Sequence, residues 1–389
     1  MKLFHLSDLH IGKQLNGYSL KENQVAVLNQ IVEYAGLEHP DAILICGDIY
    51  DKTSPSAEAY TIFGNFLEAL SQISPQITIL IIAGNHDSPE RLSYAGTFLE
   101  KHRIHLSVFP PRKPEDYLKK VVLQDEYGPV NFYLLPFLKP GYVRQLCPEN
   151  PPEGYEQAVS LVLSRESVDK NQRNILLSHQ FYTGGGKDPQ TCESEQTVIM
   201  AGGLDRVDAL VLQDFDYTAL GHIHGPQNVF GERIRYCGSP YKYSVSEEHH
   251  KKSVTVLHIR EKGENPEMKF LPLCGIQDVR QERGSLKEVI SRATKENCHD
   301  FIRVTLTDEE EPYRIRERLE EVYDHLLELR VDNERTREKL MEAEDPVPVL
   351  NPLEAFHQFY HAVRGEELPE EAKMIMETIV QEAKEEEGI

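Results

Sequence analysis

The chain has 389 residues, of which 40% are hydrophobic and 27% are charged, so it can form a large core with one or two smaller units and is not expected to be disordered. Its formal net charge of −22 disfavours strong binding of DNA by this chain alone, because DNA is itself a polyanion. The longest strongly apolar run, residues 77–83, is too short to span a membrane, and polar residues 7 and 8 interrupt the amino terminus too early for a signal peptide. We therefore expect a cytoplasmic protein with no membrane partner.

The amino-terminal part of the chain repeats one pattern, in which an apolar strand runs directly into a polar loop. The strands are expected at Lys2–Leu6, Ala42–Cys46, residues 77–83, residues 174–177 and Tyr217–Leu220. Continuous apolar runs of this length, bounded by glycine and polar residues, are typical of strands that are buried on both faces.

Two stretches between these strands have the apolar spacing of helices, namely residues 23–34 and residues 56–70. Strands that alternate with helices predict an α/β core with helices covering both faces. Residues 253–259 are expected to form a late strand of the same core.

A second unit is expected to begin near Cys274. Its strands are predicted at residues 278–281, Phe301–Leu306 and residues 326–331, and its helices at residues 285–294 and 312–323. The first of these helices opens with the capping-box pattern of Ser285 and Glu288. The sequence of this small α+β unit holds no cluster of metal-binding residue types.

The carboxy-terminal part of the chain is acidic. From Thr307 onwards there are 25 acids and 10 bases, a net charge of −15, so most of the acidity lies outside the first unit. The prolines in residues 345–349 predict a stiff linker. Two short amphipathic helices are expected beyond it, at residues 352–363 and 369–386. Because isolated short helices are marginally stable, they either dock back on the body or fold against a partner.

Each predicted strand of the first part except the late one is followed by side chains that can bind a metal ion. These candidate ligands are Asp8, His10, Asp48, Asn85, His179, His222 and His224. Because sites in open α/β sheets collect at the carboxyl ends of strands, we expect these side chains to converge. Mixed Asp, His and Asn ligation is typical of Mn²⁺, Fe²⁺ or Zn²⁺. Two ions about 3.5–4 Å apart need a shared ligand, and Asp48, the lone acid of its loop, is the natural candidate.

A single histidine after a strand is usually a capping or packing residue, so His179 alone would predict little. The prediction depends on the whole ordered series of motifs. The histidines without such a context are expected to be ordinary surface or structural residues: His5, His39, His102, His105, His249 and His250. The six cysteines include no Cys-x-x-Cys pair, so neither a zinc ribbon nor a thioredoxin-like site is predicted.

The ordered motifs resemble those of the calcineurin-like metallophosphoesterase superfamily, which includes protein phosphatases, cyclic-nucleotide phosphodiesterases and DNA nucleases. The local sequence further resembles that of the SbcD family of bacterial exonuclease subunits at residues 5–13, 47–51, 54–56, 205–208 and 217–224. This family belongs with the nuclease subunits of double-strand-break repair complexes. The resemblance implies three parts: an α/β metallophosphoesterase β-sandwich flanked by helices in residues 1–272, a DNA-contacting capping domain in residues 273–344, and a linker with a helix pair in residues 345–389. That helix pair would dock onto an SbcC-type coiled-coil ATPase.

The resemblance also implies roles for single residues. One ion would bind to Asp8, His10, Asp48 and His224, and the other to Asp48, Asn85, His179 and His222. His86 would orient or protonate the leaving oxygen, and Asp87 would hold His86 in place. Mn²⁺ is the expected metal, with Mg²⁺ or Fe²⁺ as alternatives. Archaeal and eukaryotic relatives often carry a histidine where this chain has Asp51, which leaves the role of Asp51 open.

The expected activity is two-metal hydrolysis of phosphodiester bonds at double-stranded DNA ends and hairpins, by a homodimer that forms a heterotetramer with the ATPase. A stand-alone phosphoesterase for small phosphodiesters or phosphoproteins is an alternative, although it would not need the appended domain and helix pair. A non-catalytic scaffold for DNA and the ATPase is another, although every ligand position holds a metal-competent residue. Manganese-dependent release of nucleotides from a duplex distinguishes the three, because the small-substrate enzyme would cleave only a model phosphodiester and the scaffold would cleave neither.

Overall fold

The computed structural model describes residues 1–195, 205–309 and 313–334, together with residues 356–357, 360–361, 368–369 and 372–376. The chain divides into two compact units, of which the first comprises Met1–Thr305 and Pro312–Arg330 and the second Leu306–Glu311 and Val331–Ile389. The linker predicted at residues 345–349 and most of the two predicted carboxy-terminal helices lie outside the described residues. The domain limits predicted at residues 272 and 344 therefore stay a prediction.

Two six-stranded sheets dominate the first unit. The first sheet has the order β16 (Glu267–Pro272), β15 (Ser253–His258), β1 (Lys2–Leu6), β4 (Ala42–Cys46), β5 (Thr78–Ile82) and β6 (Ile104–Ser107). The second has the order β13 (Gln227–Phe230), β14 (Ile234–Tyr236), β12 (Tyr217–Leu220), β9 (Arg173–Ser178), β8 (Gly128–Leu135) and β7 (Lys119–Asp125). Strands β1, β4, β5 and β6 are parallel, as are β8, β9, β12 and β14. In each sheet the carboxyl ends of the parallel strands therefore gather at one edge.

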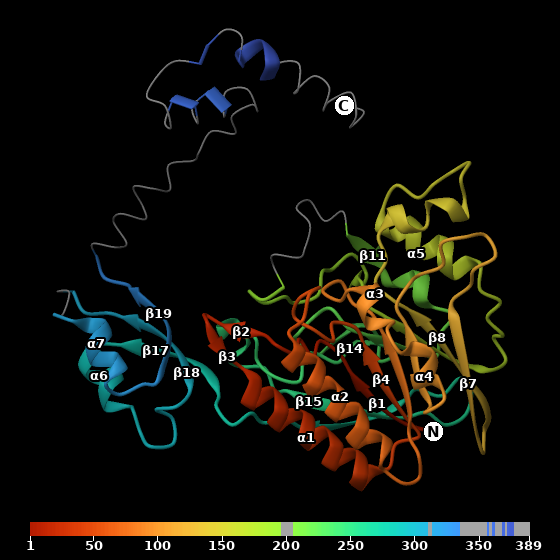
Figure 1. Cartoon of the computed structure of the whole chain (residues 1–389), viewed down its shortest axis with the longest axis horizontal. Coiled ribbons are helices and arrows are strands. Elements are labelled where there is room, and N and C mark those ends of the chain that lie inside the picture. Colours follow the sequence, from red (N-terminus) through yellow and green to blue (C-terminus); the bar gives the residue numbers. More distant parts are fainter. Residues whose placement is uncertain are drawn as a thin grey trace. The chain divides into compact units, whose positions relative to one another are not determined.

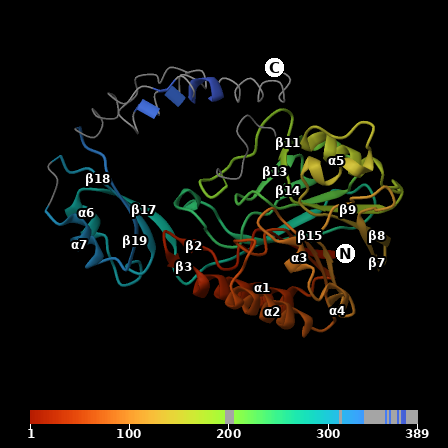
Figure 2. The same cartoon turned by 45° about the horizontal axis from the view of Figure 1, so that its top comes forward.

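The sheets face each other across a shared apolar core, in which Leu44 and Leu80 of the first sheet pack with Phe132 and Leu177 of the second. The outer face of the first sheet is covered by α1 (Lys21–Glu38) and α2 (Ala57–Ser71), which lie side by side, and that of the second by α5 (Tyr155–Ser164). Figure 2 shows α1 and α2 on one side of the sheets and α5 on the other. The predicted α/β fold, a β-sandwich flanked by helices, is confirmed.

Local sequence signals explain where several elements begin. The Ser56 side chain accepts a hydrogen bond from the Ala59 N–H and so caps α2.

Strands β1, β4 and β12 have the predicted bounds, and β5 and β9 differ from the prediction by one residue at each end. Shorter elements of this unit are β2 (Gln14–Leu15), β3 (Tyr18–Ser19), α3 (Pro89–Leu92), α4 (Gly96–Glu100), β10 (Phe181–Thr183) and β11 (Arg206–Asp208).

A separate three-stranded sheet follows the sandwich in the sequence, with the order β17 (Val279–Gly284), β18 (Phe301–Leu306) and β19 (His325–Val331). Helix α6 (Leu286–Ser291) has the predicted capping box between Ser285 and Glu288. Helix α7 (Ile315–Glu320) is shorter than predicted, because Arg314 has a left-handed φ of 53° and the helix begins only after it.

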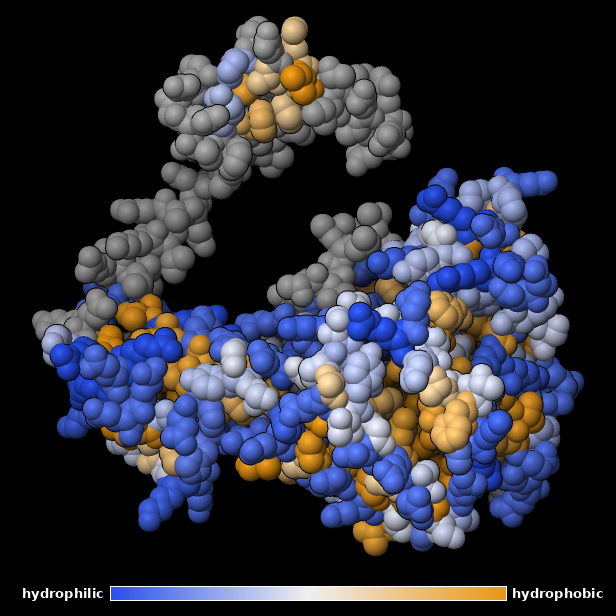
Figure 3. All heavy atoms as spheres, viewed as in Figure 1, coloured by the Kyte–Doolittle hydropathy of each residue, from blue (hydrophilic) through white to orange (hydrophobic). Residues whose placement is uncertain are grey.

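Hydrophobic side chains lie mainly inside these layers. The face drawn in Figure 3 is largely hydrophilic, with hydrophobic residues visible in gaps between the hydrophilic ones. Within the described ranges, the helices are either too short or too polar to cross a membrane.

His5 of β1 joins the two sheets. Its Nδ1 lies 3.0 Å from the Tyr217 hydroxyl and its Nε2 lies 3.1 Å from the Leu220 carbonyl oxygen, both in β12. A neutral imidazole satisfies both partners, because Nε2–H can donate to the carbonyl while Nδ1 accepts from the hydroxyl. Burial, with the charge of Arg235, lowers the pKa of His5 from its ordinary value of 6.5 to about 3. His5 is therefore a neutral structural residue.

Acid should destabilise the metal-free protein through His5. Between pH 6.5 and about pH 3 the unfolded chain holds a proton on this side chain that the folded protein excludes. The contribution of His5 to stability is therefore complete above pH 6.5 and is lost as the pH falls. We expect the melting temperature of the wild type to decrease more steeply from pH 7 to pH 5 than that of His5→Gln. Parallel curves in a thermal-denaturation series would contradict this prediction.

Candidate metal centre

The loops that follow β1 and β4 are held together beyond the ends of the strands. The Asp8 N–H donates to the Gly47 carbonyl at 3.0 Å, and the His10 N–H donates to the Asp48 carbonyl at 3.0 Å. Asp8, His10 and Asp48 have left-handed φ angles of 53°, 42° and 51°. Residues with side chains rarely adopt this conformation, and it persists only where the surroundings hold it. The continued backbone pairing provides that support and fixes the three side chains.

Two glycines allow the other loops to approach Asp48 and His179 closely. A Cβ atom on Gly84 would collide with the backbone nitrogen and the carboxylate of Asp48. A Cβ atom on Gly221 would collide with the Cys46 carbonyl and lie 2.7 Å from the His179 ring. Glycine is therefore required at both places for the loops after β5 and β12 to reach the same spot.

The side chains of Asn85, His179 and His222 meet at this spot. The Asn85 Oδ1 atom lies 3.0 Å from His179 Nε2 and 3.0 Å from His222 Nδ1. His179 Nδ1 lies 2.6 Å from the Cys46 carbonyl, so Nδ1–H donates there and Nε2 is the nitrogen that faces the cluster. His179 Nε2 is also 3.3 Å from the Asp48 carboxylate. Three loops from two sheets thus present metal-binding atoms to one another.

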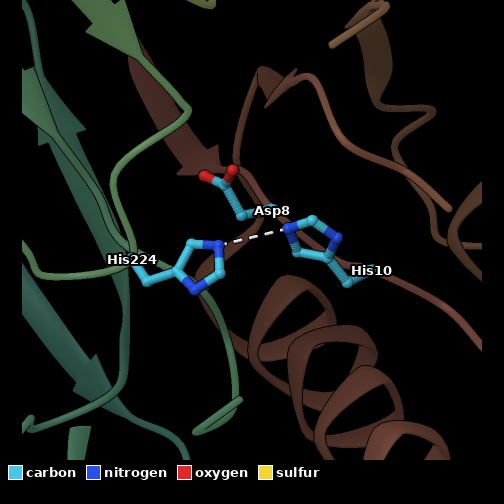
Figure 4. A group of neighbouring side chains, drawn as sticks. All are labelled: Asp8, His10 and His224. Atoms are coloured by element: carbon cyan, nitrogen blue, oxygen red, sulfur yellow. Dashed lines mark hydrogen bonds between the residues drawn. The ribbon is translucent and has the colours of Figure 1, made fainter. Parts of the chain in front are cut away.

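A neighbouring group contains Asp8, His10 and His224. The two Nε2 atoms of His10 and His224 face each other at 3.1 Å, with the Asp8 side chain beside them (Figure 4). One ligand atom from each of the three lies within 4.8 Å of the others, and the same holds for Asp8, Asp48 and His179. The Asp48 carboxylate is 3.7 Å from His10 Nε2. Asp48 thus borders both groups, and the seven predicted side chains converge.

The electrostatics of this cluster favour a positive charge at its centre. Asp8 and Asp48 are 0% and 2% exposed. Burial lowers the pKa of His179, but the Asp48 and Asp8 carboxylates outweigh it and raise this pKa to about 9. Burial and the neighbouring His179 lower the pKa of His222 to about 3. A protonated imidazole beside two buried carboxylates marks a place where cations are stabilised. Carboxylate, imidazole and amide donors of this kind fit divalent ions.

His86 lies at the border of the cluster, and its ring is held differently from the prediction. Its Nδ1–H donates to the Asp51 carbonyl at 2.9 Å, and its backbone N–H donates to Asp48 Oδ1 at 2.9 Å. The Asp51 carboxylate lies 2.7 Å from Lys13 Nζ and 3.7 Å from His10 Nδ1. Asp51, whose role the sequence left open, therefore orients His86 through its backbone and lies against His10 through its side chain.

Asp87 does not hold the His86 ring, contrary to the expectation from the sequence. Its carboxylate instead accepts three backbone hydrogen bonds, from Gly84 at 2.9 Å, Tyr50 at 3.1 Å and Ile49 at 3.2 Å. These donors lie in the loops after β5 and β4. Asp87 thus fastens together the two loops that carry Asn85 and Asp48.

Residues 1–226 match the family of calcineurin-like phosphoesterases. The chain belongs to this family. Residues 276–364 of this calcineurin-like phosphoesterase match a second family, the type 5 capsule protein repressor C-terminal domain. The phosphoesterase is 32% identical over 332 residues to the SbcD subunit of nuclease SbcCD from Staphylococcus epidermidis, which covers 85% of each chain. It is 29% identical over 374 residues to the SbcD subunit of nuclease SbcCD from Staphylococcus saprophyticus, which covers 95% of this chain and 94% of the relative. It therefore belongs with the SbcD proteins.

Sequence reasoning missed a polar shell behind His224 of the phosphoesterase. His224 Nδ1 lies 2.9 Å from Ser194 Oγ and 3.3 Å from Glu247 Oε1, and the Glu195 carboxylate accepts the His224 backbone N–H. Burial raises the pKa of Glu247, but Lys252 and His224 outweigh it and hold this pKa well below its ordinary value. These side chains follow no apolar strand of the recurring pattern, so the rule that found the ligands could not find them.

Bound metal should stabilise the folded phosphoesterase, because cations would neutralise the buried Asp8 and Asp48 carboxylates. We expect Mn²⁺ added to EDTA-treated protein to raise the melting temperature, with about 2.7 kcal/mol of stabilisation at a hundred times the dissociation constant. Ca²⁺ at the same concentration is the control for ionic strength, because it prefers sites made only of oxygen atoms. Equal melting curves with Mn²⁺ and with Ca²⁺ would contradict a histidine-rich metal centre.

Proposed function

We propose that this phosphoesterase is the nuclease subunit of an SbcCD-type complex and cleaves phosphodiester bonds at double-stranded DNA ends and hairpins. The chain is a metal-dependent phosphodiester hydrolase by family. The observation that carries the proposal is the convergence of seven ligand-type side chains, from loops of two facing sheets, at one buried spot. The similarity to the SbcD subunits of nuclease SbcCD over most of the chain supports DNA as the substrate.

The proposed ligands divide into two groups that share one carboxylate. Asp8, His10, Asp48 and His224 would hold one ion, and Asp48, Asn85, His179 and His222 the other. Mn²⁺ is proposed, with Mg²⁺ or Fe²⁺ as alternatives. When bound, the two ions supply a nucleophile at neutral pH and stabilise charge on the phosphoryl oxygens.

His86 is proposed to protonate the leaving oxygen. Because its Nδ1–H is taken by the Asp51 carbonyl, Nε2 is the nitrogen left to face a substrate. The ring lies edge-on to His10, with the ring centroids 4.9 Å apart, which keeps it next to the proposed ions. A histidine in such a position is suited to donate a proton near neutral pH. Asp87 contributes by fixing the loops beneath His86 and Asp48.

The partner is proposed to be an SbcC-type coiled-coil ATPase. Similarity to the SbcD subunits of nuclease SbcCD supports such a complex. Docking through the carboxy-terminal helices, a homodimer within a heterotetramer, and a cytoplasmic location belong to the same proposal. The net charge of −22 gives a physical reason for a partner, since a strongly acidic chain binds DNA weakly and needs a basic surface supplied by another subunit.

The test is a cleavage assay on linear duplex and hairpin DNA with Mn²⁺, with and without the cognate ATPase. A small model phosphodiester is assayed in parallel. Mn²⁺-dependent release of nucleotides that stops on addition of EDTA is expected. Cleavage of the model phosphodiester alone would favour a small-substrate phosphoesterase. Cleavage of neither substrate, with or without the ATPase, would favour a non-catalytic scaffold.

A further inference from the structure

We infer that Glu247, together with Lys252 and Ser194, is a positioning residue that fixes the His224 imidazole as a metal ligand. This inference rests on the ligand set proposed above and adds residues that do not themselves contact an ion. Three observations support it: the contacts of the His224 ring, the burial of Glu247, and the contacts of Lys252 with both Glu247 and the His224 backbone.

The two ring nitrogens of His224 have different surroundings. Nε2 lies 3.1 Å from His10 Nε2, on the side of the proposed ions (Figure 4). Nδ1 lies on the other side of the ring, 2.9 Å from Ser194 Oγ and 3.3 Å from Glu247 Oε1. A metal-binding histidine commonly donates its second N–H to a carboxylate, which fixes both the tautomer and the orientation of the ring. Glu247 and Ser194 are placed to accept that N–H.

Glu247 cannot easily move away from His224. It is fully buried, and its Oε2 atom lies 2.6 Å from Lys252 Nζ, which is also buried. The same ammonium group donates to the His224 carbonyl at 3.0 Å and to Ser239 Oγ at 2.7 Å. The Ser194 hydroxyl lies 2.8 Å from Glu247 Oε1. One buried ion pair thus holds the backbone of His224 through Lys252 and its ring through Glu247.

A purely stabilising role would not explain this arrangement. Burying a charged pair costs desolvation free energy that its attraction often only balances, so such pairs are weak evidence for stability. A third metal site is also disfavoured. Cys192, Glu247 and His250 bring ligand atoms within 4.8 Å of one another, but the Glu247 oxygens already face the Lys252 ammonium and the His224 ring. Orientation of a proposed ligand is the role that uses the contacts of Glu247 with His224, Ser194 and Lys252, while the hydrogen bonds that Glu247 accepts from the Tyr243 N–H and the Ser244 hydroxyl hold its own loop.

The test is a charge-balanced double variant, Glu247→Gln with Lys252→Met, in the full-length chain. Removing both members avoids leaving one unpaired buried charge. Mn²⁺ binding to metal-free protein is followed by calorimetry, and the coupling of two Mn²⁺ ions by electron paramagnetic resonance. We expect the affinity of one site to fall by about 10–100-fold while the other is retained. At stoichiometric loading, the spin-coupled signal should give way to that of isolated ions.

The control is Asp125→Asn, which also removes a carboxylate from an ion pair, here between a half-buried Asp125 and the buried Arg173. The Asp125 carboxylate contacts Arg173, the amino terminus and the Tyr127 N–H, rather than a proposed ligand. It should lose stability and keep both Mn²⁺ affinities. If the double variant does not fold, Ser194→Ala is tested in the same assays instead. A several-fold weaker Mn²⁺ affinity is then expected at one of the two sites.

Two tight sites and a wild-type coupled signal in the folded variant would overturn the positioning role, even if the melting temperature fell. This outcome differs from failure of the ligand set, in which the wild-type chain itself would not bind a pair of ions. The two proposals therefore fail in distinguishable ways.

Discussion

Replacing Asp48 with alanine is expected to remove both ions and reduce DNA cleavage by about 10⁴-fold or more, toward the uncatalysed rate. The Asp48 carboxylate lies 3.3 Å from His179 Nε2 and 3.7 Å from His10 Nε2, so it borders both proposed ligand groups. It also accepts the His86 N–H, so its loss releases the loop that presents His86. Every other proposed ligand belongs to only one group.

The measurement for Asp48→Ala is the number of Mn²⁺ ions per chain, determined with the rate of duplex cleavage. Asp216→Asn is the matched control, because Asp216 is another buried aspartate, and it accepts the Asn174 N–H and pairs with Lys262. The control should bind two ions and cleave DNA. Retention of two ions by a folded Asp48→Ala variant would show that Asp48 is not the shared ligand.

His86→Ala is expected to leave metal binding intact and lower turnover by about 10²–10⁴-fold, the usual contribution of a positioned acid or base. His86 is not one of the seven proposed ligands. Its Nδ1–H is taken by the Asp51 carbonyl, although its ring lies edge-on to His10 and one of its ring nitrogens lies within 4.8 Å of ligand atoms of His10 and Asp48. Its loss therefore removes a proton donor without removing a ligand.

A second substrate separates loss of the proton donor from loss of the metal centre. A nitrophenyl phosphodiester has a leaving group that needs no proton, so His86→Ala should hydrolyse it at a rate close to that of the wild type. His249→Ala, which removes a 90% exposed histidine side chain, is the control and should resemble the wild type on both substrates. Equal losses on DNA and on the nitrophenyl ester would contradict a role in leaving-group protonation, and loss of the ions would make His86 a structural residue.

The sequence predicted those parts of the fold and site that depend on local signals. Strands such as β4 and β5 are continuous apolar runs, and every candidate ligand follows such a run, so ligand positions could be read without knowing which strands are neighbours. The hairpin of β7 and β8 was missed, because β7 (Lys119–Asp125) begins with two lysines, ends with an aspartate and forms an edge of its sheet. Edge strands need not be apolar on both faces.

Contacts between distant residues were not predictable. Glu247 lies in a polar stretch of sequence that predicts an exposed turn. No signal in the neighbouring sequence indicates that Glu247 is buried and that the Lys252 ammonium neutralises its charge. The hydrogen bonds of Asp87 depend on the approach of the loops after β4 and β5, which adjacency to His86 in the sequence does not reveal. Likewise, the neutral state of His5 follows from its contacts with β12, more than two hundred residues away.

The division of the proposed ligands between the two sheets has a consequence for the newly made protein. Asp8, His10, Asp48 and Asn85 come from the first sheet, and His179, His222 and His224 come from the second. If translation stops before the residues that follow β12, the released chain lacks His222 and His224. A prematurely terminated product would therefore hold an incomplete set of the proposed ligands and should not bind the pair of ions.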